Sequence, residues 1–196
     1  MSDCAKRPLL VGIAGGSGAG KTTIAKILRT KLGSKKTEII ALDRFFKPLQ
    51  KLPKYLSLYH GEYRPDFNRP DSLYARKMAS FCKKLSGRRV FLLDGHFSLY
   101  FPQMRRLLGV KCFVDSGIKE MLARRTRRNL KINYGGSRDD IMHYNNECVE
   151  PNYRRFLLPT KKYADIIIPN GKRLAARKRA INRLIEIINA RVFKSL

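Results

Sequence analysis

Hydrophobic and polar positions fall into blocks along the chain, and these blocks predict buried strands separated by amphipathic helices. Unbroken apolar runs are typical of parallel strands that are covered on both faces. The first run ends in a glycine-rich loop, after which helical periodicity begins at Lys21 and stops at Gly33. The strands that we expect are Leu9–Ala14, Thr37–Leu42, Arg89–Leu93, Val110–Val114 and Ala164–Ile168.

The segments between these strands are predicted to be mostly helical. Pro70 should open a helix that runs to about Leu85, and Asp71 or Ser72 is suited to capping it. Residues 43–69 show no clear period and contain three prolines, so we expect loop and short helix there. The other predicted helices are Lys21–Leu32, Phe101–Leu108, Ile118–Lys131, Asp139–Phe156 (despite Pro151) and Leu174–Val192.

Alternation of strands with helices predicts an α/β fold in three layers. Its centre is a five-stranded, mostly parallel sheet with helices on both faces. The 196 residues suit one domain, residues 1–196, and they are enough for a sizeable core.

Composition indicates an ordinary globular protein, with 43% hydrophobic residues. No stretch approaches the roughly 18 apolar residues of a spanning helix, and the run at Leu9 is too short for a signal sequence. We therefore expect a cytoplasmic protein. The cysteines are scattered and form no CxxC pair, which argues against a disulfide framework or a zinc site and makes Cys82 and Cys112 candidate core thiols. The four are Cys4, Cys82, Cys112 and Cys148.

The charge is unusual: 42 lysines and arginines against 15 aspartates and glutamates give a net charge of +27. Such a surface attracts polyanions, but charge alone names no partner. The basic residues are densest at Arg124–Arg128 and Lys172–Arg183, without the interleaved aromatics of an RNA-binding module. Weak nonspecific polyanion binding is one expectation, and homo-oligomerisation stays open.

A phosphate-binding loop is the strongest motif in the chain. The eight residues from Gly15 to Thr22 match G-x-x-x-x-G-K-[ST] after a buried strand and before a helix. Backbone N–H groups of such a loop surround phosphates, Lys21 should reach the β- and γ-phosphates of ATP, and Thr22 should bind Mg²⁺. The nucleotide-binding candidates are Gly15, Gly16, Ser17, Gly18, Ala19, Gly20, Lys21 and Thr22.

Two predicted strands end in aspartate, Asp43 and Asp94, which should lie at the same sheet edge as the phosphate loop. Phosphoryl transfer needs a carboxylate that positions the metal and a group that deprotonates the acceptor hydroxyl. Asp43 is our candidate general base, and Asp94 is our candidate Mg²⁺ ligand with Thr22; Asp43 is a further candidate ligand. The alternative is that either aspartate only caps a neighbouring helix.

An arginine cluster precedes a predicted break at Tyr134–Ser137. Arg125 and Arg128 lie three positions apart and therefore share a helix face. A helix, a break and a second helix rich in arginine resemble a lid, about residues 124–143, whose arginines meet the transferring phosphoryl group. Arg125 and Arg128 are accordingly catalytic candidates, and a solvated basic face is the alternative.

In order along the chain, these motifs resemble the uridine kinase family, within the phosphoribulokinase/uridine kinase group of P-loop kinases. Gly15–Thr23 resembles the family's GGSxSGKTT loop and adds Thr23 to the nucleotide-binding candidates. Residues 43–47 resemble the segment that carries the family's base, and residues 67–73 resemble its FDHPDAF segment. Residues 123–128 resemble the lid helix, and Pro159–Pro169 is nearly identical to PTKKYADVIIP. The resemblance implies Mg·ATP as the phosphoryl donor.

Departures from the family pattern concern the acceptor. The family's β-hairpin that reads the pyrimidine, between the FDHPDAF helix and the third strand, is missing here. Asn68 stands where the family has an aspartate that binds the ribose hydroxyls, and Asp66 is a candidate replacement. In the lid, the family's R-G-R becomes Asn133-Tyr134-Gly135, which leaves Arg138 as the nearest substitute.

Nicotinamide riboside kinases of the same group also lack that hairpin, and Asp43–Pro48 resembles their DDFFKP segment. Aromatic side chains between Asp43 and Asp71 can stack on a flat base or merely pack against the sheet. His96 can face the acceptor or serve as a structural hydrogen-bonding residue. The acceptor-site candidates are Phe46, Tyr63, Asp66, Phe67, Asn68 and His96.

The expected function is ATP-dependent phosphorylation of a nucleoside 5′-hydroxyl, with uridine or cytidine first. One alternative is a kinase of another hydroxylated metabolite such as nicotinamide riboside. A second, from another class, is a nucleotide-dependent polyanion-binding protein with a residual kinase site. Turnover of a nucleoside distinguishes the kinases from the last alternative.

Overall fold

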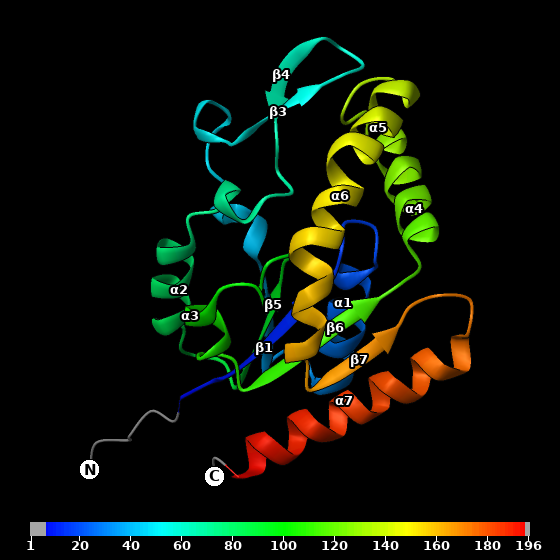
Figure 1. The fold of residues 1–196 in the computed structure, drawn as a ribbon. Coiled ribbons are helices and arrows are strands. Elements are labelled where there is room, and N and C mark those ends of the chain that lie inside the picture. The colour runs from blue at the N-terminus through cyan, green and yellow to red at the C-terminus, as the bar shows by residue number, and fades with distance from the viewer. Residues whose placement is uncertain (1–6, 195–196) are drawn as a thin grey trace.

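The computed structural model describes residues 7–194, so Cys4 and the N-terminal residues before Arg7 lie outside it. A five-stranded parallel sheet forms the centre of the molecule (Figure 1), in the order β2-β5-β1-β6-β7. The predicted α/β fold is thereby confirmed, with every pair in this sheet parallel. The strands are β1 Leu9–Ala14, β2 Thr37–Ala41, β5 Val90–Asp94, β6 Val110–Asp115 and β7 Ile166–Pro169.

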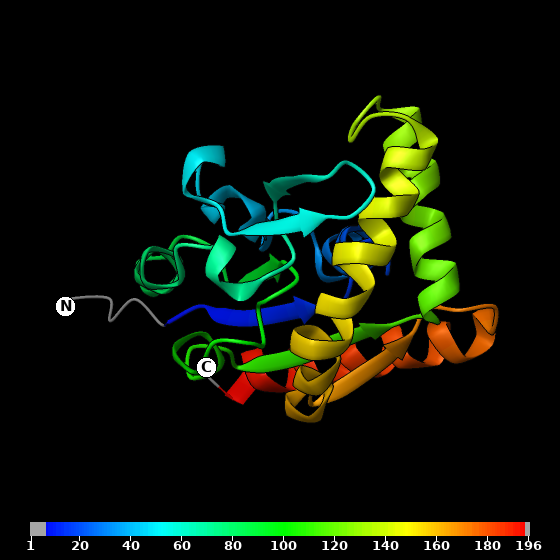
Figure 2. The same cartoon turned by 45° about the horizontal axis from the view of Figure 1, so that its top comes forward.

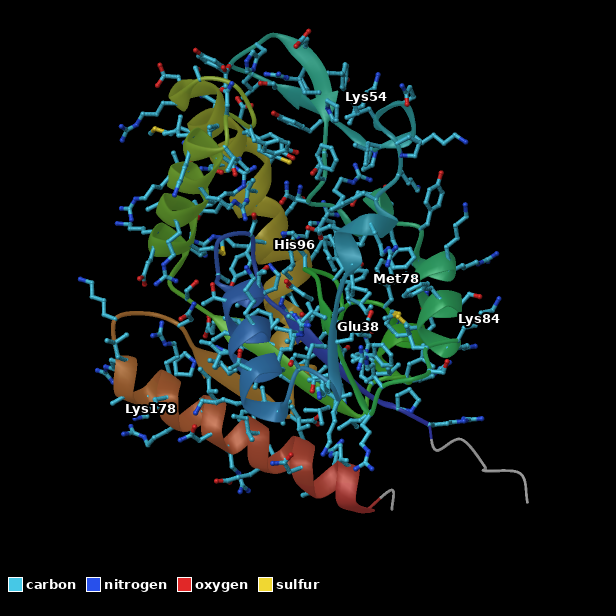
Figure 3. The ribbon with its side chains drawn as sticks, turned by 180° about the vertical axis from the view of Figure 1, so that it is seen from behind. Glu38, Lys54, Met78, Lys84, His96 and Lys178 are labelled. Atoms are coloured by element: carbon cyan, nitrogen blue, oxygen red, sulfur yellow. The ribbon has the colours of Figure 1, made fainter. Side chains whose placement is uncertain are left out.

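Helices cover both faces of the sheet. Helices α1 (Lys21–Leu32) and α7 (Leu174–Lys194) pack against each other and lie in front of the sheet in the view of Figure 3. The opposite face is covered by α2 (Ala75–Lys83), α3 (Pro102–Arg105) and a long helical run, residues 138–157, that comes forward in Figure 1. The buried aromatic side chains of Phe91, Phe97 and Phe113 lie in one continuous core between these layers.

The helical run 138–157, called here the return helix, follows α4 (Ile118–Lys131) after a break. It begins with α5 (Arg138–Tyr144) and contains the short α6 (Glu150–Asn152). Wider π-helical turns occupy Asn145–Val149 and Tyr153–Leu157, on both sides of Pro151. Proline has no N–H to donate to the preceding turn, and a widened turn accommodates it without ending the helix. The predicted helix over this segment is confirmed, with that local change in pitch.

A second, two-stranded sheet was not predicted. Strands β3 (Lys54–Ser57) and β4 (Glu62–Pro65) pair antiparallel within the segment expected to be loop and short helix, so that expectation was incomplete. The hairpin turns at Gly61, whose φ of +67° suits glycine. Both strands are only four residues long and too short to display an alternating pattern. The rest of this segment forms two 3₁₀ turns, Leu42–Phe45 and Leu49–Lys51.

The start of α2 differs from the prediction as well. Pro70–Ser72 forms a separate 3₁₀ turn, α2 begins only at Ala75, and neither Asp71 nor Ser72 caps it. The Ser72 hydroxyl donates to the Arg69 carbonyl at 2.6 Å. Leu73 forms an isolated antiparallel bridge with Phe46, and its extended backbone keeps it out of the helix, which therefore begins later. This pairing is tertiary, and helical periodicity cannot reveal it.

The remaining elements agree with the sequence more closely. Helix α3 is shorter than predicted, and a 3₁₀ helix, Leu158–Tyr163, leads from the return helix to β7. Among residues 7–194, none of the helices is both long and apolar enough to span a bilayer. Cys82, Cys112 and Cys148 are buried free thiols, as expected of the first two.

Candidate active site

The phosphate loop joins β1 to α1 at the carboxyl edge of the sheet. Its backbone turns through positive φ at Gly18, where a Cβ atom would lie 2.2 Å from the carbonyl oxygen of Met121 in α4. A residue with any side chain would therefore push the loop and α4 apart. The loop and the first lid helix are in direct backbone contact at this point.

Lys21 points back into the loop. Its ammonium group is buried and donates to the Gly16 carbonyl oxygen at 3.0 Å. Burial lowers the pKa of Lys21, and the nearby carboxylates of Asp94 and Asp43 oppose that shift. A positive charge held inside a ring of backbone N–H groups is suited to the phosphates of a nucleotide.

Thr22 and Asp94 meet beside Lys21. The Thr22 hydroxyl donates to Asp94 Oδ2 at 2.6 Å, and Asp94 is only 8% exposed at the end of β5. A hydroxyl and a carboxylate oxygen beside a phosphate loop fit Mg²⁺, which takes few protein ligands and completes its shell with phosphate and water. Among the described residues there is no cluster of three or more histidine, cysteine or acidic side chains arranged as a metal site.

Asp43 lies in the 3₁₀ turn that follows β2, on the same sheet edge, with 62% of its side chain exposed. His96 Nδ1, in the turn after β5, is 3.8 Å from Asp43 Oδ1. Burial raises the pKa of Asp43, but the His96 ring and the charges of Lys21 and Arg128 outweigh it and lower the pKa overall. Asp43 is therefore ionised and open to an approaching hydroxyl.

The His96 ring, with 16% of its side chain exposed, is a neighbour of Asp43. Figure 3 places it level with the loop that precedes α1. Burial, followed by the charge of Lys21, lowers the pKa of His96, so the ring is neutral at pH 7. Its Nε2 atom is buried without a hydrogen-bond partner among the described residues, which leaves one polar atom free beside Asp43.

Asn170 holds the phosphate loop from the last strand and was missed at the sequence level. Its amide donates to the Ala19 carbonyl oxygen at 2.6 Å, and its own oxygen accepts from Arg177 at 3.1 Å. A signal was present, because Asn170 directly follows β7 and parallel strands end at the same sheet edge. The same rule that singled out Asp43 and Asp94 therefore also applied to Asn170.

The two lid arginines have different surroundings. Arg128 donates to the Ser17 hydroxyl at 3.2 Å and so reaches the phosphate loop. Arg125 is buried, donates to Asn145 Oδ1 at 2.5 Å and lies 5.2 Å from the Tyr144 ring centre. Of the two candidates, Arg128 faces the site, whereas Arg125 holds α4 to the return helix.

Arg138 does not reach the phosphate loop in this structure. It lines a cavity with Leu122, Thr126 and Leu130, on the face of α4 opposite to Met121, which touches the loop. Resemblance to the family's lid pattern suggested Arg138, but a glycine-rich break turns the chain before it. We therefore correct its assignment to the outer face of the lid.

Asp66 and Asn68 are buried in contacts with the return helix. Asp66 accepts from the Asn152 amide at 2.8 Å and from the Cys148 thiol at 2.9 Å, and it is 1% exposed. The Asn68 amide donates to the Tyr144 hydroxyl at 2.9 Å. The carboxylate of Asp66 is thus occupied by structural partners, which corrects its expected role as a replacement ligand for a ribose.

The aromatic candidates separate into two groups. Phe46 and Phe67 are half-buried and meet edge-on at 5.4 Å between ring centres; Phe46 follows Asp43 by three residues, and the ring contact brings Phe67 to it. Tyr63 projects from β4 with 68% exposure. Phe46, Phe67 and His96 are therefore grouped near the base, and Tyr63 is not part of that group in this structure.

The β3–β4 hairpin docks on the return helix, as Figure 2 shows for its tip. Glu147 accepts from the Ser57 hydroxyl at 2.8 Å and from the Tyr59 backbone N–H at 3.0 Å. The Tyr59 ring stacks on His143 at 3.8 Å. His60 Nε2 lies 2.8 Å from Asp140 Oδ1, and hydrogen bonds from Ser137 and His60 lower the pKa of Asp140 to about 2. This connection between the acceptor-side hairpin and the lid was missed at the sequence level.

Comparisons with known proteins bear on the family and the fold. The model of the phosphoribulokinase / uridine kinase family matches residues 64–176, and the zeta toxin model matches residues 2–85. Uridine-cytidine kinase B of Dictyostelium discoideum is 29% identical over 95% of this chain and 84% of its own length. Uridine kinase of Chloroflexus aggregans is 29% identical over 85% of this chain and 88% of its own length. Uridine-cytidine kinase A of Dictyostelium discoideum is 30% identical over 85% of this chain, which spans 37% of that relative.

Solved structures with the same fold are also kinases. A Silicibacter protein described as a fructose transport system kinase has a TM-score of 0.64 at 19% identity, over 86% of this chain and 93% of its own. Shikimate kinase from Bacteroides thetaiotaomicron has a TM-score of 0.56 at 19% identity, over 92% of this chain and 98% of its own. These likenesses establish the P-loop kinase fold. Because the family model matches more than half of the chain, the protein belongs to the phosphoribulokinase/uridine kinase family.

Proposed function

We propose that this protein transfers the γ-phosphoryl group of Mg·ATP to the 5′-hydroxyl of a nucleoside. The observation that carries the proposal is the meeting of Lys21, the Thr22–Asp94 pair and the ionised Asp43 at one sheet edge. Family membership supports the same reaction class.

Each of these residues has a distinct task in the proposed reaction. The phosphate loop and Lys21 bind the phosphates; Thr22 and Asp94 would hold Mg²⁺, which would supply positive charge to offset that of the phosphates. Asp43 accepts the proton of the acceptor hydroxyl. The oxygen of that hydroxyl forms a bond to the γ-phosphorus as the bond from phosphorus to ADP breaks and ADP leaves. Arg128 stabilises negative charge on the transferring group from the lid side.

The names of the relatives favour uridine or cytidine as the acceptor. In this chain the polar residues near the base that can read an acceptor are fewer than in the family pattern. Asn68 is bonded to Tyr144 and Asp66 to Asn152 and Cys148, whereas His96 Nε2 is free. His96 Nε2 is enclosed, so it can accept from a ribose hydroxyl only after the side chains around it move. Nicotinamide riboside is a second candidate, because the chain lacks the hairpin that reads the pyrimidine in the family.

The assignment of the base is tested by Asp43→Asn. We expect the substitution to lower kcat by roughly 10²- to 10⁴-fold, because general base catalysis typically contributes that much. Affinity for ATP should stay the same, since Lys21 and Thr22 are untouched. The matched control is Asp71→Asn, an exposed aspartate that pairs with Arg69 at 2.9 Å.

The reaction itself is tested by a coupled assay of ADP release with uridine, cytidine and nicotinamide riboside. Turnover that disappears in Asp43→Asn and is kept in Asp71→Asn is the expected result. Absence of turnover with every nucleoside, together with salt-sensitive RNA binding, would instead favour the polyanion-binding alternative. A rate in Asp43→Asn within about tenfold of the parent would show that another group is the base.

A further inference from the structure

The lid has a hollow outer face that no step of the proposed reaction uses. A cavity of about 430 Å³ lies between α4 and the return helix, within the usual size range of small-molecule sites. Its apolar lining comes from Leu122, Leu130 and Met142, of which Leu130 and Met142 are 42% and 46% exposed. Met121, on the opposite face of α4, touches the phosphate loop, so the cavity faces away from the nucleotide.

Two arginines give this cavity its charge. Arg127 and Arg138 line it, one from α4 and the other from the start of α5. None of the described residues that line it carries a carboxylate. An apolar lining together with two arginines is complementary to an anion with an apolar body. A second copy of this chain would bring the same arginines together and add to the repulsion of a protein with a net charge of +27.

One residue that lines the cavity, Asn145, also forms the hydrogen bond that joins α4 to the return helix. Asn145 accepts from Arg125 at 2.5 Å and donates to the Thr126 hydroxyl at 2.9 Å. Arg125 in turn packs against Gly18, since a Cβ atom built on that glycine would lie 3.2 Å from Arg125 Cβ. Two residues, Asn145 and Arg125, therefore connect the cavity to the phosphate loop.

We propose that this cavity is an effector site for a small organic anion, a phosphate or carboxylate attached to one or two rings. Its occupant contacts Asn145 and so alters how Arg125 and the phosphate loop are held. The effect on ATP rests on the proposed kinase function, whereas binding of the anion does not.

Binding is tested with the aromatic sulfonate 1-anilinonaphthalene-8-sulfonate on the full chain, with the nucleotide site filled by a non-hydrolysable ATP analogue. Fluorescence titration should show a site whose affinity falls about fivefold in Arg127→Gln and again in Arg138→Gln, as expected for partly exposed charge pairs. Ala123→Trp should fill the cavity and lower affinity by more than either arginine substitution. The matched control is Arg179→Gln, which removes an exposed arginine from α7.

Competition identifies the source of the anion. Displacement of the probe by uridine monophosphate indicates a nucleotide effector, and displacement by indole-3-acetate indicates an aromatic carboxylate. Displacement by inorganic phosphate at equal concentration would overturn the proposal, because the apolar lining would then contribute nothing. Equal affinities in the parent, Arg127→Gln and Ala123→Trp would overturn it as well.

The effector role has its own readout. ATP-analogue affinity, measured by calorimetry with and without saturating probe, should differ severalfold in the parent and be equal in Ala123→Trp, because coupling between two sites is reciprocal. An unchanged affinity in the parent would refute the effector role. Self-association of the parent that Ala123→Trp abolishes, seen by sedimentation, would show that a second copy occupies the cavity.

Discussion

Arg125 and Arg128 lie three positions apart in α4, and their different partners give them different tasks. A side chain that touches the phosphate loop through Ser17 can meet a phosphoryl group, whereas one that is buried against Asn145 and Tyr144 stabilises the lid. Helical spacing predicts that both lie on one face of α4, but it does not predict which of them contacts the phosphate loop.

This difference predicts opposite phenotypes for matched substitutions. Arg128→Gln should lower kcat by roughly 10²- to 10³-fold, as loss of a donor to transition-state charge typically does, with little change in Tm. Arg125→Gln should instead cost about 1–3 kcal/mol of stability, because it disturbs a buried charge-assisted hydrogen bond. Steady-state kinetics and thermal unfolding of both variants test this. A catalytic defect without loss of Tm in Arg125→Gln would contradict the assignment.

The buried His96 predicts a pH dependence of stability. Its pKa in the folded protein is lower than its ordinary value of 6.5, so the unfolded chain binds the proton more readily. The free energy of unfolding should therefore be highest above pH 6.5 and fall as the pH is lowered through the folded-state value. In His96→Phe this loss between pH 7 and pH 5 should be smaller, as measured by urea unfolding at a series of pH values. An equal loss in both proteins would show that His96 does not contribute.

A sequence pattern identifies residues whose chemistry is local, and it misses those whose role depends on a distant partner. Lys21, Thr22 and Asp94 were predicted because the loop motif and the strand ends determine where they lie. Asp66 was misassigned because its donors, Asn152 and Cys148, come from a helix more than eighty residues further along the chain. No local pattern indicates that a carboxylate is already saturated.

At the scale of elements, the β3–β4 hairpin and the return helix form one connected unit. Glu147 is its central contact, because its carboxylate binds both Ser57 and Tyr59 of the hairpin. The hairpin follows Asp43 along the chain, and these bonds join it to the return helix.

Glu147→Ala is expected to release the hairpin. Backbone amides of residues 54–65 should then exchange with solvent faster, by roughly tenfold for each 1.4 kcal/mol by which local stability falls. The matched control is Glu150→Ala, one turn away on the same helix, because Glu150 pairs within the helix, with Arg154 at 2.8 Å. Hydrogen exchange followed by mass spectrometry distinguishes the two variants. Equal exchange in the hairpin of both would disprove the docking role of Glu147.

The elements that were predicted well are those with a continuous apolar run or a helical repeat of apolar residues. Five apolar runs gave the five parallel strands, and α1 and α4 match their periodic segments. The hairpin and the delayed start of α2 were missed because each depends on tertiary pairing, to the return helix in one case and between Phe46 and Leu73 in the other.

At the scale of the whole molecule, we propose that the chain forms a single domain, since one continuous core includes residues from β1 to α7. The net charge of +27 surrounds that core, and α7 presents an exposed basic face above its buried Ile181, Leu184 and Ile188. Such a face favours polyanions without sequence preference.

Binding to single-stranded polyuridylate should accordingly weaken steeply with salt. Substituting Lys172, Lys178 and Arg179 together by glutamine should reduce the slope of log K against log salt by roughly 0.7 for each phosphate that is no longer neutralised. Fluorescence anisotropy at several salt concentrations measures this slope, and the rate of phosphoryl transfer should stay the same. A slope that does not change would show that α7 is not the polyanion-binding face.

The contact of Asn170 with Ala19 also determines when the site can form during synthesis. The phosphate loop leaves the ribosome well before β7 does, yet its Ala19 carbonyl is held by an amide that is translated about 150 residues later. A nascent chain that ends before β7 can contain the whole loop motif without this support. We therefore expect ATP binding to appear late in translation, after the last strand has joined the sheet.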